Sequence, residues 1–477
     1  MNIHFFQDDT QATIHAYFLT KEFCSSFQEE TEKEAQQLPH IVCQMITMAK
    51  KDDFKGAAGS IVCYPSFSTD GSSWIFLVGS GSGTEDDLRQ AYGNLGYELR
   101  ERNLEHVAIY SVEHIELAVN ALAIGNYRFD RNKKEDKRKK SLLDCYLQCT
   151  ADDSAVHRAQ TISGARNFAR DLINMPPADL YPEILANFAT ELVTNQISVE
   201  VWDAEKIAAE NMGGITAVGQ GSSNPSRFIH LHYKPKGEAK QKIGLVGKGV
   251  TFDAGGLSLK TSAGMQTMRC DMSGSAAVLG IFKILGSLDV DVEVHGFIGA
   301  VENMCAANSY KLGDVLRMRN GKTVEVHNTD AEGRLVMADC LAYASELGVD
   351  KLIDIATLTG ACMVALGTRY SGLFTQNDGL ANELLQCAHD QGEGLWRLPL
   401  PEFYRPLLKT DWADVKNIGG PWGGSITAAL FLSEFVDGPD WAHIDIAGPA
   451  FFDKKTQHFA TGGAGPMVET IFDWLES

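Results

Sequence analysis

Apolar and polar residues alternate along the first 150 positions in a pattern that predicts strands separated by helices. Ser73–Val78 and His106–Tyr110 are apolar runs with the length of buried strands. Glu85–Arg102 repeats its apolar residues with the period of a helix. Strands that alternate with helices are typical of α/β domains, so we predict a smaller N-terminal α/β domain over residues 1–150.

A long helix and a pair of prolines follow this region. The pattern predicts a helix over Asp153–Asn174, and Pro176 and Pro177 cannot continue it. We interpret residues 151–175 as a linker helix between two domains.

Residues 176–477 return to alternating strands and helices, with apolar runs too continuous for half-exposed strands. These runs include Lys242–Val246, Val292–Ala300 and Lys351–Ala356. Continuous apolar strands indicate a sheet buried on both faces. We predict a larger C-terminal catalytic domain with a mixed, largely parallel sheet flanked by helices.

Length and composition place the chain among globular proteins of the cytoplasm. Its 477 residues exceed what one hydrophobic core usually serves, which favours two domains. No apolar stretch approaches 18 residues, and the first residues lack the pattern of a secretion signal. The ten cysteines form no CxxC pair, which indicates reduced thiols. We therefore expect a cytoplasmic protein with no membrane partner.

The net charge of -20 argues against nucleic acid as a partner, because that affinity comes largely from cations that replace counterions. Arg131–Lys140 is the one strongly basic run. It is interpreted as a solvated hairpin loop, with a docking patch as the alternative.

Three segments of the predicted C-terminal domain carry acidic residues next to strands. In VGKGVTFDAGG, the strand ending at Val246 is expected to run into a glycine-rich loop with Lys248 and Asp253. These two could form an ordinary loop ion pair or bind a metal. Asp271, in MRCDM, opens a predicted helix of small residues, where an aspartate could be a cap or a ligand.

The third segment is NTDAEGRL, residues 328–335, in which Asp330 and Glu332 would share one face of an extended chain. Four carboxylates placed together would repel one another and take up protons unless cations accompany them. We therefore infer two divalent ions. No HExxH motif is present, and an oxygen-rich set suits hard cations, so the residues leave the metal identity open.

The strings VGKGVTFDAGGLSLK, MRCDM, NTDAEGRL, IATLTGA and WAHIDIAG resemble the leucine aminopeptidase (cytosol aminopeptidase) family, over most of the second domain. The first domain matches only in its architecture, which in the family is macro-like. The resemblance implies a metallo-exopeptidase that removes an apolar N-terminal residue, such as leucine or methionine, from peptides. It also implies a homohexamer built as a dimer of trimers.

The resemblance assigns roles to the acidic residues. Asp253 and Glu332 would bridge the two metals, Asp330 would complete one site, and Lys248 with Asp271 the other. The expected ions are zinc and manganese, with magnesium or cobalt as alternatives. A hydroxide shared by the two metals would attack the peptide bond.

The resemblance also supplies the remaining residues of the site. Lys260 would polarise the scissile carbonyl, and Arg334 would hold a bicarbonate that acts as general base. The implied substrate-binding residues are Met268, Asn328, Thr357, Leu358, Gly360 and Ala450.

Two other functions remain as alternatives. Some bacterial members of the family act on DNA, and here only the basic run supports that function. A catalytically silent scaffold is the second alternative, against which the complete ligand set argues. His230 and His232 share one face of a predicted strand and could bind a metal, but are interpreted as strand surface.

Overall fold

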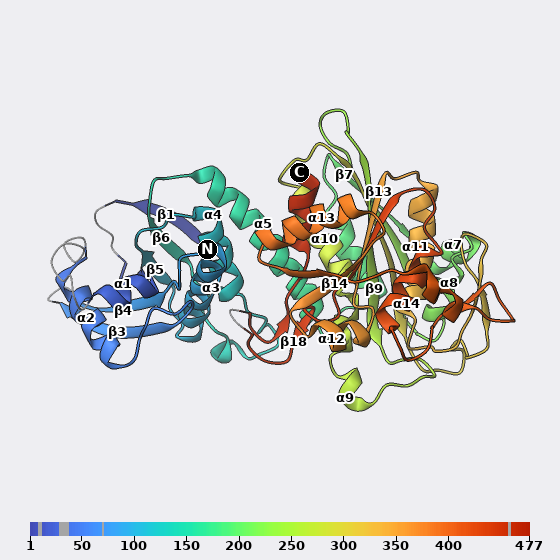
Figure 1. Cartoon of the computed structure of the whole chain (residues 1–477), viewed down its shortest axis with the longest axis horizontal. Coiled ribbons are helices and arrows are strands. Elements are labelled where there is room, and N and C mark those ends of the chain that lie inside the picture. The colour runs from blue at the N-terminus through green and yellow to red at the C-terminus, as the bar shows by residue number, and fades with distance from the viewer. Residues whose placement is uncertain (8–11, 28–37, 69–70, 457–458) are drawn as a thin grey trace. The chain divides into compact units, whose positions relative to one another are not determined.

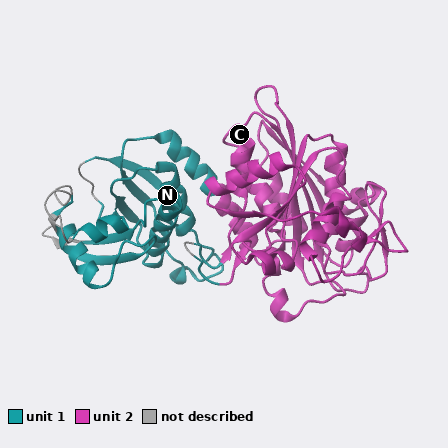
Figure 2. Ribbon diagram, in the orientation of Figure 1, with its two compact units in different colours: residues 1–164, 454–461 teal, residues 165–453, 462–477 magenta. Residues whose placement is uncertain are grey.

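The computed structural model describes residues 1–7, 12–27, 38–68, 71–456 and 459–477. The chain forms two compact units, residues 1–164 with 454–461 and residues 165–453 with 462–477 (Figure 2). Helix α5 has the bounds expected from the sequence, Asp153–Asn174, and its residues are divided between the units. The sequence-based division was 1–150, 151–175 and 176–477, and it did not separate residues 454–461 from the rest.

The N-terminal unit contains the predicted α/β sheet with six strands (Figure 1). In spatial order the strands are β1 (Asn2–Phe6), β6 (Asp144–Gln148), β5 (His106–Ile109), β2 (Ile14–Leu19), β4 (Gly71–Gly79) and β3 (Ile61–Ser68). All neighbouring strands are parallel except the pair β3 and β4. This part of the fold confirms the predicted class.

Helices connect these strands. They are α1 (Lys21–Ser26), α2 (His40–Lys51), α3 (Glu85–Glu101), α4 (Ile115–Asn126) and the 3₁₀ turn η2 (Glu135–Lys137). Two of them, α1 and α3, begin at a threonine cap. The hydroxyl of Thr84 accepts a hydrogen bond from the Asp87 amide at the start of α3. Three acidic residues in the first turn of α3 complement the helix dipole.

The basic run Arg131–Lys140 is largely exposed, as expected. It connects α4 to β6 and so joins a helix to a strand, which makes the hairpin prediction wrong. The Arg138 guanidinium donates to the carbonyl oxygens of Arg131 and Lys133, so part of the charge serves the loop itself.

The C-terminal unit is organised around an eight-stranded sheet. In spatial order its strands are β15 (Gly394–Arg397), β14 (Tyr370–Phe374), β17 (Asp440–Asp445), β13 (Lys351–Ala356), β9 (Lys242–Asp253), β10 (Glu293–Asn303), β8 (Arg227–Tyr233) and β7 (Ile197–Trp202). Four of the seven pairings are parallel. The mixed, largely parallel sheet is thereby confirmed.

Helices flank this sheet, and short strands form two small additional sheets. The helices are α6 (Pro182–Thr190), α7 (Ala204–Ala209), α8 (Gly213–Gly219), α9 (Ser262–Met265), η3 (Met268–Met272), α10 (Ser273–Leu285), α11 (Gly333–Glu346), α12 (Gly360–Leu366), α13 (Asp378–Asp390), η4 (Glu402–Leu408), α14 (Gly424–Ser433) and α15 (Val468–Glu476). The short strands are β11 (Val315–Arg317), β12 (Thr323–Glu325), β16 (Val415–Lys416), β18 (Phe451–Phe452) and β19 (Gly462–Gly463). Within the described ranges, no helix is long and apolar enough to cross a bilayer.

Two central elements are buried almost throughout. All but one residue of α10 is buried, as is most of α11, and both helices pack on β9. Side chains from β9, β10 and α11, among them Val250, Phe297 and Leu335, share one hydrophobic cluster. Burial on this scale fixes where β9 ends, and the candidate site lies at that end.

Candidate active site

The strand β9 continues further than the sequence suggested. Lys248 was expected in a loop after Val246, but β9 remains a strand up to Asp253 and is buried at nearly every position. Its parallel neighbour β10 ends at Asn303, the register partner of Asp253. The turn after β9 uses Gly255 and Gly256, both with positive φ. Open α/β sheets form their sites where parallel strands end in this way.

Lys248 lies at the centre of the first group of charged side chains. Its Nζ is 2.8 Å from Asp271 Oδ1 and 3.0 Å from Glu332 Oε1. It also donates a hydrogen bond of 2.9 Å to the carbonyl oxygen of Thr357. A Cβ atom on Gly333 would lie 2.4 Å from the Lys248 side chain, so the glycine of NTDAEGRL makes room for this lysine.

Lys260 holds the second group. Its Nζ is 2.8 Å from Asp253 Oδ2 and 2.6 Å from Asp330 Oδ1. The Lys260 amide donates to the Ala254 carbonyl, which closes the turn that follows β9. The five residues assigned as metal ligands, together with Lys260, therefore converge at one end of the sheet.

The acidic residues reach this position by routes other than those expected. Asp271 lies in the 3₁₀ turn η3, and α10 begins after Met272 without a side-chain cap, so Asp271 is not a helix cap. Asp330 and Glu332 do not lie on an extended segment. The Asp330 amide donates to Asn328 Oδ1 in a turn, and Glu332 is the residue before α11. The turn, and not strand alternation, brings the two carboxylates together.

Four carboxylates face only two ammonium groups, and the pKa values reflect the imbalance. Burial, followed by the charge of Glu332, raises the pKa of Asp253 to about 6. Burial also raises the pKa of Asp271 well above its usual range, despite Lys248. For Lys248, burial alone would lower the pKa, but Asp271 and Glu332 raise it above its ordinary value. Without metal, the site therefore has more negative charge than its lysines balance.

The site fits divalent cations. Oxygen atoms of Asp253, Asp330 and Glu332 all lie within 4.8 Å of one another. Asp271 Oδ2 and Glu332 Oε2 are buried and have no hydrogen-bond partner among the described residues. Buried carboxylate oxygens without partners are costly, and hard cations take oxygen ligands of this kind.

Arg334 lies next to this cluster, in the first turn of α11, and is 7% exposed. Its Nη1 donates to the Asn417 carbonyl at 2.7 Å, whereas its Nε finds no acceptor within the described part of the chain. Burial lowers the pKa of Arg334 to about 10, and the charges of Glu332 and Asp445 only partly offset it. A buried guanidinium with an unpaired donor is suited to a small anion.

The predicted substrate-binding residues occupy different settings. Thr357 follows β13, and its hydroxyl donates to Asp271 Oδ1 at 2.8 Å, so it joins the site directly. Asn328 orders the turn that carries Asp330. Met268 shares η3 with Asp271, and the Leu358 amide donates to Asp445. Gly360 begins α12, and Ala450 is buried.

Sequence reasoning missed Asn303. Its Nδ2 donates to Asp253 Oδ1 at 2.8 Å and to the Thr329 carbonyl at 2.9 Å, and the residue is fully buried. It therefore fixes the orientation of Asp253 and ties the ends of β9 and the NTDAEGRL turn together. A polar residue that follows the apolar run Phe297–Val301 was the available signal.

Comparison with known proteins settles the family. The family model described as "Cytosol aminopeptidase family, catalytic domain" matches residues 167–472, and the model of the family's N-terminal domain matches residues 26–136. This chain belongs to the cytosol aminopeptidase family. A probable cytosol aminopeptidase of Aquifex aeolicus is 42% identical over 90% of this chain and 89% of its own length. One of Persephonella marina is 40% identical over 94% and 95%.

Solved structures of similar proteins share the whole fold. A lysine-to-glutamate mutant of tomato leucine aminopeptidase is 33% identical with a TM-score of 0.90, over 100% of this chain and 96% of its own. The bottromycin maturation enzyme BotP in complex with Mn is 32% identical with a TM-score of 0.86, over 98% and 99%. As a family member, this chain is a metallo-exopeptidase of the leucyl aminopeptidase type that acts on peptides.

Proposed function

We propose that this family member removes apolar N-terminal residues, such as leucine or methionine, from peptides with two divalent metal ions. The convergence of four carboxylates on two lysines, with unpartnered oxygens among them, supports the proposal. Asp253 and Glu332 would lie between the ions. Asp330 would complete one site, and Lys248 with Asp271 the other.

Lys248 takes part as a neutral amine in this arrangement. Without metal it pairs with Asp271 and Glu332 as an ammonium, and a dication placed among these carboxylates would expel its proton. Zinc and manganese are the proposed ions, with magnesium and cobalt as alternatives. The Mn complex of BotP supports manganese.

The metals, when bound, supply an activated water and a Lewis acid for the amide bond. The Lys260 ammonium, with a side chain 17% exposed, would donate to the scissile carbonyl oxygen and stabilise its developing charge. Asp271 Oδ2, which is unpartnered, would accept a hydrogen bond from the substrate's free α-amino group. Recognition of that group limits cleavage to the first peptide bond.

Arg334 would hold a bicarbonate that takes up a proton from the attacking water. Its unpaired Nε, its burial and its position beside Glu332 in the first turn of α11 support this role. The carbonyl of Asn417 fixes the other side of the guanidinium, so one direction remains for an anion.

The first substrate pocket would be formed by Met268, Asn328, Thr357, Leu358, Gly360 and Ala450. Met268 and Leu358 are half-buried apolar side chains, which suits a leucine or methionine side chain. Thr357 connects this wall to Asp271, so the side-chain pocket and the α-amino site would be neighbours.

The proposed assembly is a homohexamer, a dimer of trimers, in the cytoplasm. Trp412 and Trp422 are 79% and 84% exposed, and large exposed aromatic residues are enriched at subunit contacts. The names of the relatives as cytosol aminopeptidases support the compartment.

Glu332→Gln tests the proposed function. The substitution keeps the side-chain shape but removes a metal ligand, so the hydrolysis of leucine para-nitroanilide should fall by at least about 1,000-fold. Metal per subunit, measured by mass spectrometry after dialysis, should fall as well.

Glu346→Gln is the matched control, since Glu346 ends the same helix and forms an exposed ion pair with Arg319. It should retain full activity and metal content. If Glu332→Gln hydrolysed the substrate at a near-normal rate, the proposed site would be wrong.

A further inference from the structure

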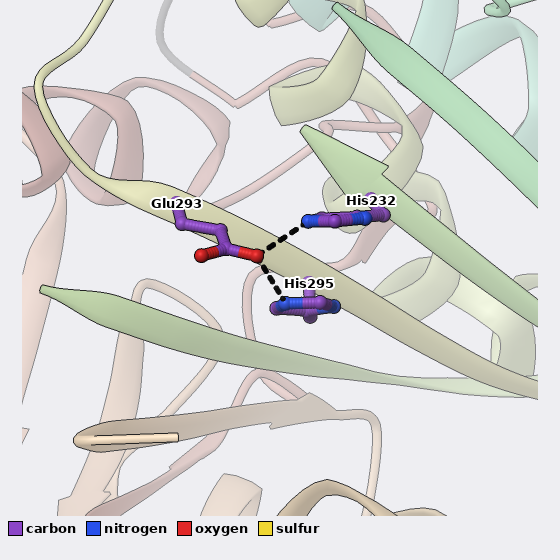
Figure 3. A group of neighbouring side chains, drawn as sticks. All are labelled: His232, Glu293 and His295. Carbon is purple, nitrogen blue, oxygen red and sulfur yellow. Dashed lines mark hydrogen bonds and ion pairs between the residues drawn. The ribbon is translucent and has the colours of Figure 1, made fainter. Parts of the chain in front are cut away.

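Three side chains that could bind a metal lie at the other end of β10. His232 comes from β8, and Glu293 and His295 come from β10 (Figure 3). The two strands are antiparallel, and His232 is the register partner of His295. Glu293 precedes His295 by two residues, so all three side chains lie on one face of the sheet.

One carboxylate oxygen joins the two imidazoles. Glu293 Oε1 is 2.6 Å from His232 Nε2 and 3.2 Å from His295 Nε2. Figure 3 shows both rings directed at this oxygen, and one ligand atom from each residue lies within 4.8 Å of the others. Ligand atoms in a tetrahedral zinc site are about 3.3–3.5 Å apart, so the Glu293 oxygen must move back from His232 to admit an ion between the three residues.

A fourth residue, His230, is hydrogen-bonded to the ring of His295. His230 Nε2 lies 2.9 Å from His295 Nδ1, the ring nitrogen that faces away from Glu293. A histidine that binds a metal through one nitrogen usually donates its other N–H to a neighbouring acceptor, which orients the ring. His230 is placed to accept that hydrogen bond, and Phe297 and Tyr343 pack against its ring.

We propose that His232, Glu293 and His295 form a second metal site, which binds Zn²⁺ or a similar borderline divalent transition metal. Imidazole ligands favour zinc, nickel and copper over magnesium and calcium. The catalytic cluster offers carboxylate oxygens and a lysine nitrogen but no imidazole, so the chain would carry two sites with different ligands. The ion would link β8 to β10 across the sheet.

The proposed site is separate from the catalytic one. Asn303 lies eight positions after His295 on β10, which at about 3.3 Å per residue is ~26 Å along the strand. None of the residues near the catalytic end takes part in it.

The ligand side chains can adjust their positions around an ion. The rings of His232 and His295 are stacked at 4.1 Å and must tilt toward an ion. The side chains of His232 and Glu293 are 20% and 25% exposed, which leaves them room to move.

The test counts metal ions on the full-length enzyme. Protein loaded with Mn²⁺ is dialysed against a small excess of Zn²⁺, and total manganese plus zinc per subunit is measured by mass spectrometry. The sum is used because zinc can replace manganese in the catalytic site without changing it. Wild-type protein should bind one ion per subunit more than His232→Ala or Glu293→Gln.

Two further variants make the result specific. His230→Phe keeps all three ligands and should weaken zinc binding by about 10- to 100-fold, because it removes only the supporting acceptor. His106→Ala is the matched control. His106 and His4 pair with different oxygens of Asp144, so that group does not direct its two rings at one point.

Two results would overturn the proposal. One is a wild-type count equal to that of His232→Ala and Glu293→Gln, which would make the group an ordinary hydrogen-bonded cluster. The other is an additional ion that is lost in His106→Ala.

Discussion

A group of charged side chains lies at each end of β10, and the two groups compensate their carboxylate charge in different ways. At the carboxyl end, two lysine ammonium groups form ion pairs with four carboxylates, those of Asp253, Asp271, Asp330 and Glu332. At the amino end, one carboxylate accepts hydrogen bonds from two imidazoles. The first group keeps unpartnered buried oxygens, whereas in the second every ring nitrogen used is paired.

The difference teaches what each group needs from a metal. The catalytic group is incomplete without cations, because its carboxylates outnumber its lysines and the pKa values of Asp253 and Asp271 are raised. The side chains of the histidine group are already hydrogen-bonded to one another without a metal, and an ion would be an addition to them. Loss of metal should therefore disturb the catalytic end far more than the histidine end.

After the loss of a catalytic metal ligand, the largest effect on activity is expected from the loss of Lys260. Lys260→Met keeps the length of the side chain and removes its charge, so kcat should fall by about 100- to 1,000-fold with a small change in KM. Metal content should stay at two catalytic ions per subunit. Steady-state kinetics and metal analysis check both points.

Lys236→Met, which removes an exposed lysine paired with Asp289, should behave like wild type. Lys260 would lose its catalytic role if its variant showed a raised KM with an unchanged kcat.

Asn303 should show a smaller effect. Asn303→Ala removes the donor that orients Asp253, so metal affinity should fall by about 10- to 100-fold. Asn303→Asp has the same shape but places a carboxylate against Asp253, so affinity should fall further. Titration with Mn²⁺ followed by activity measures both. Near-normal affinity in the isosteric Asp variant would mean that Asn303 only fills space.

The smallest expected effect is on stability without metal. The raised pKa of Asp271 means that its ionised form destabilises the folded, metal-free protein at pH 7. Asp271→Asn should therefore raise the Tm of the metal-free protein by about 2–4 °C for each kcal/mol of destabilisation that the substitution removes. Mn²⁺ should no longer stabilise the variant.

The sign of the pH dependence follows from the same shift. Because the folded-state pKa of Asp271 lies above the unfolded one, the destabilisation that Asp271 causes in the metal-free wild-type protein decreases as pH falls from 7 toward 4. The gap to Asp271→Asn should close over that range. Calorimetry after chelation measures it, and a gap that widened on acidification would contradict the assignment.

Much of the fold was predictable because its signals are local. The apolar runs and the proline pair specified β13, α5 and α3 to within a residue. The three segments with acidic residues next to predicted strands contain the carboxylates that converge in the structure, and each segment is short enough to be recognised in the sequence. The resemblance to the family then supplied roles that spacing alone left open.

Other features were not predictable because they depend on contacts distant in sequence. The partner β10 and the helices packed on β9 keep the chain extended to Asp253, where glycines had suggested a loop. Asn303 reaches Asp253 only because β10 lies beside β9 in register. His232 and His295 are 63 positions apart and meet only through the antiparallel pairing of β8 with β10.

The sequence by itself therefore determined which side chains carry the chemistry, since residue type and short spacing fix the available ligands and charges. The tertiary structure alone decided which of them share a site, because strand order and register bring distant residues within hydrogen-bond distance. It also revealed that His232, interpreted from the sequence as strand surface, has Glu293 and His295 beside it. Burial then set the pKa values, which no local pattern encodes.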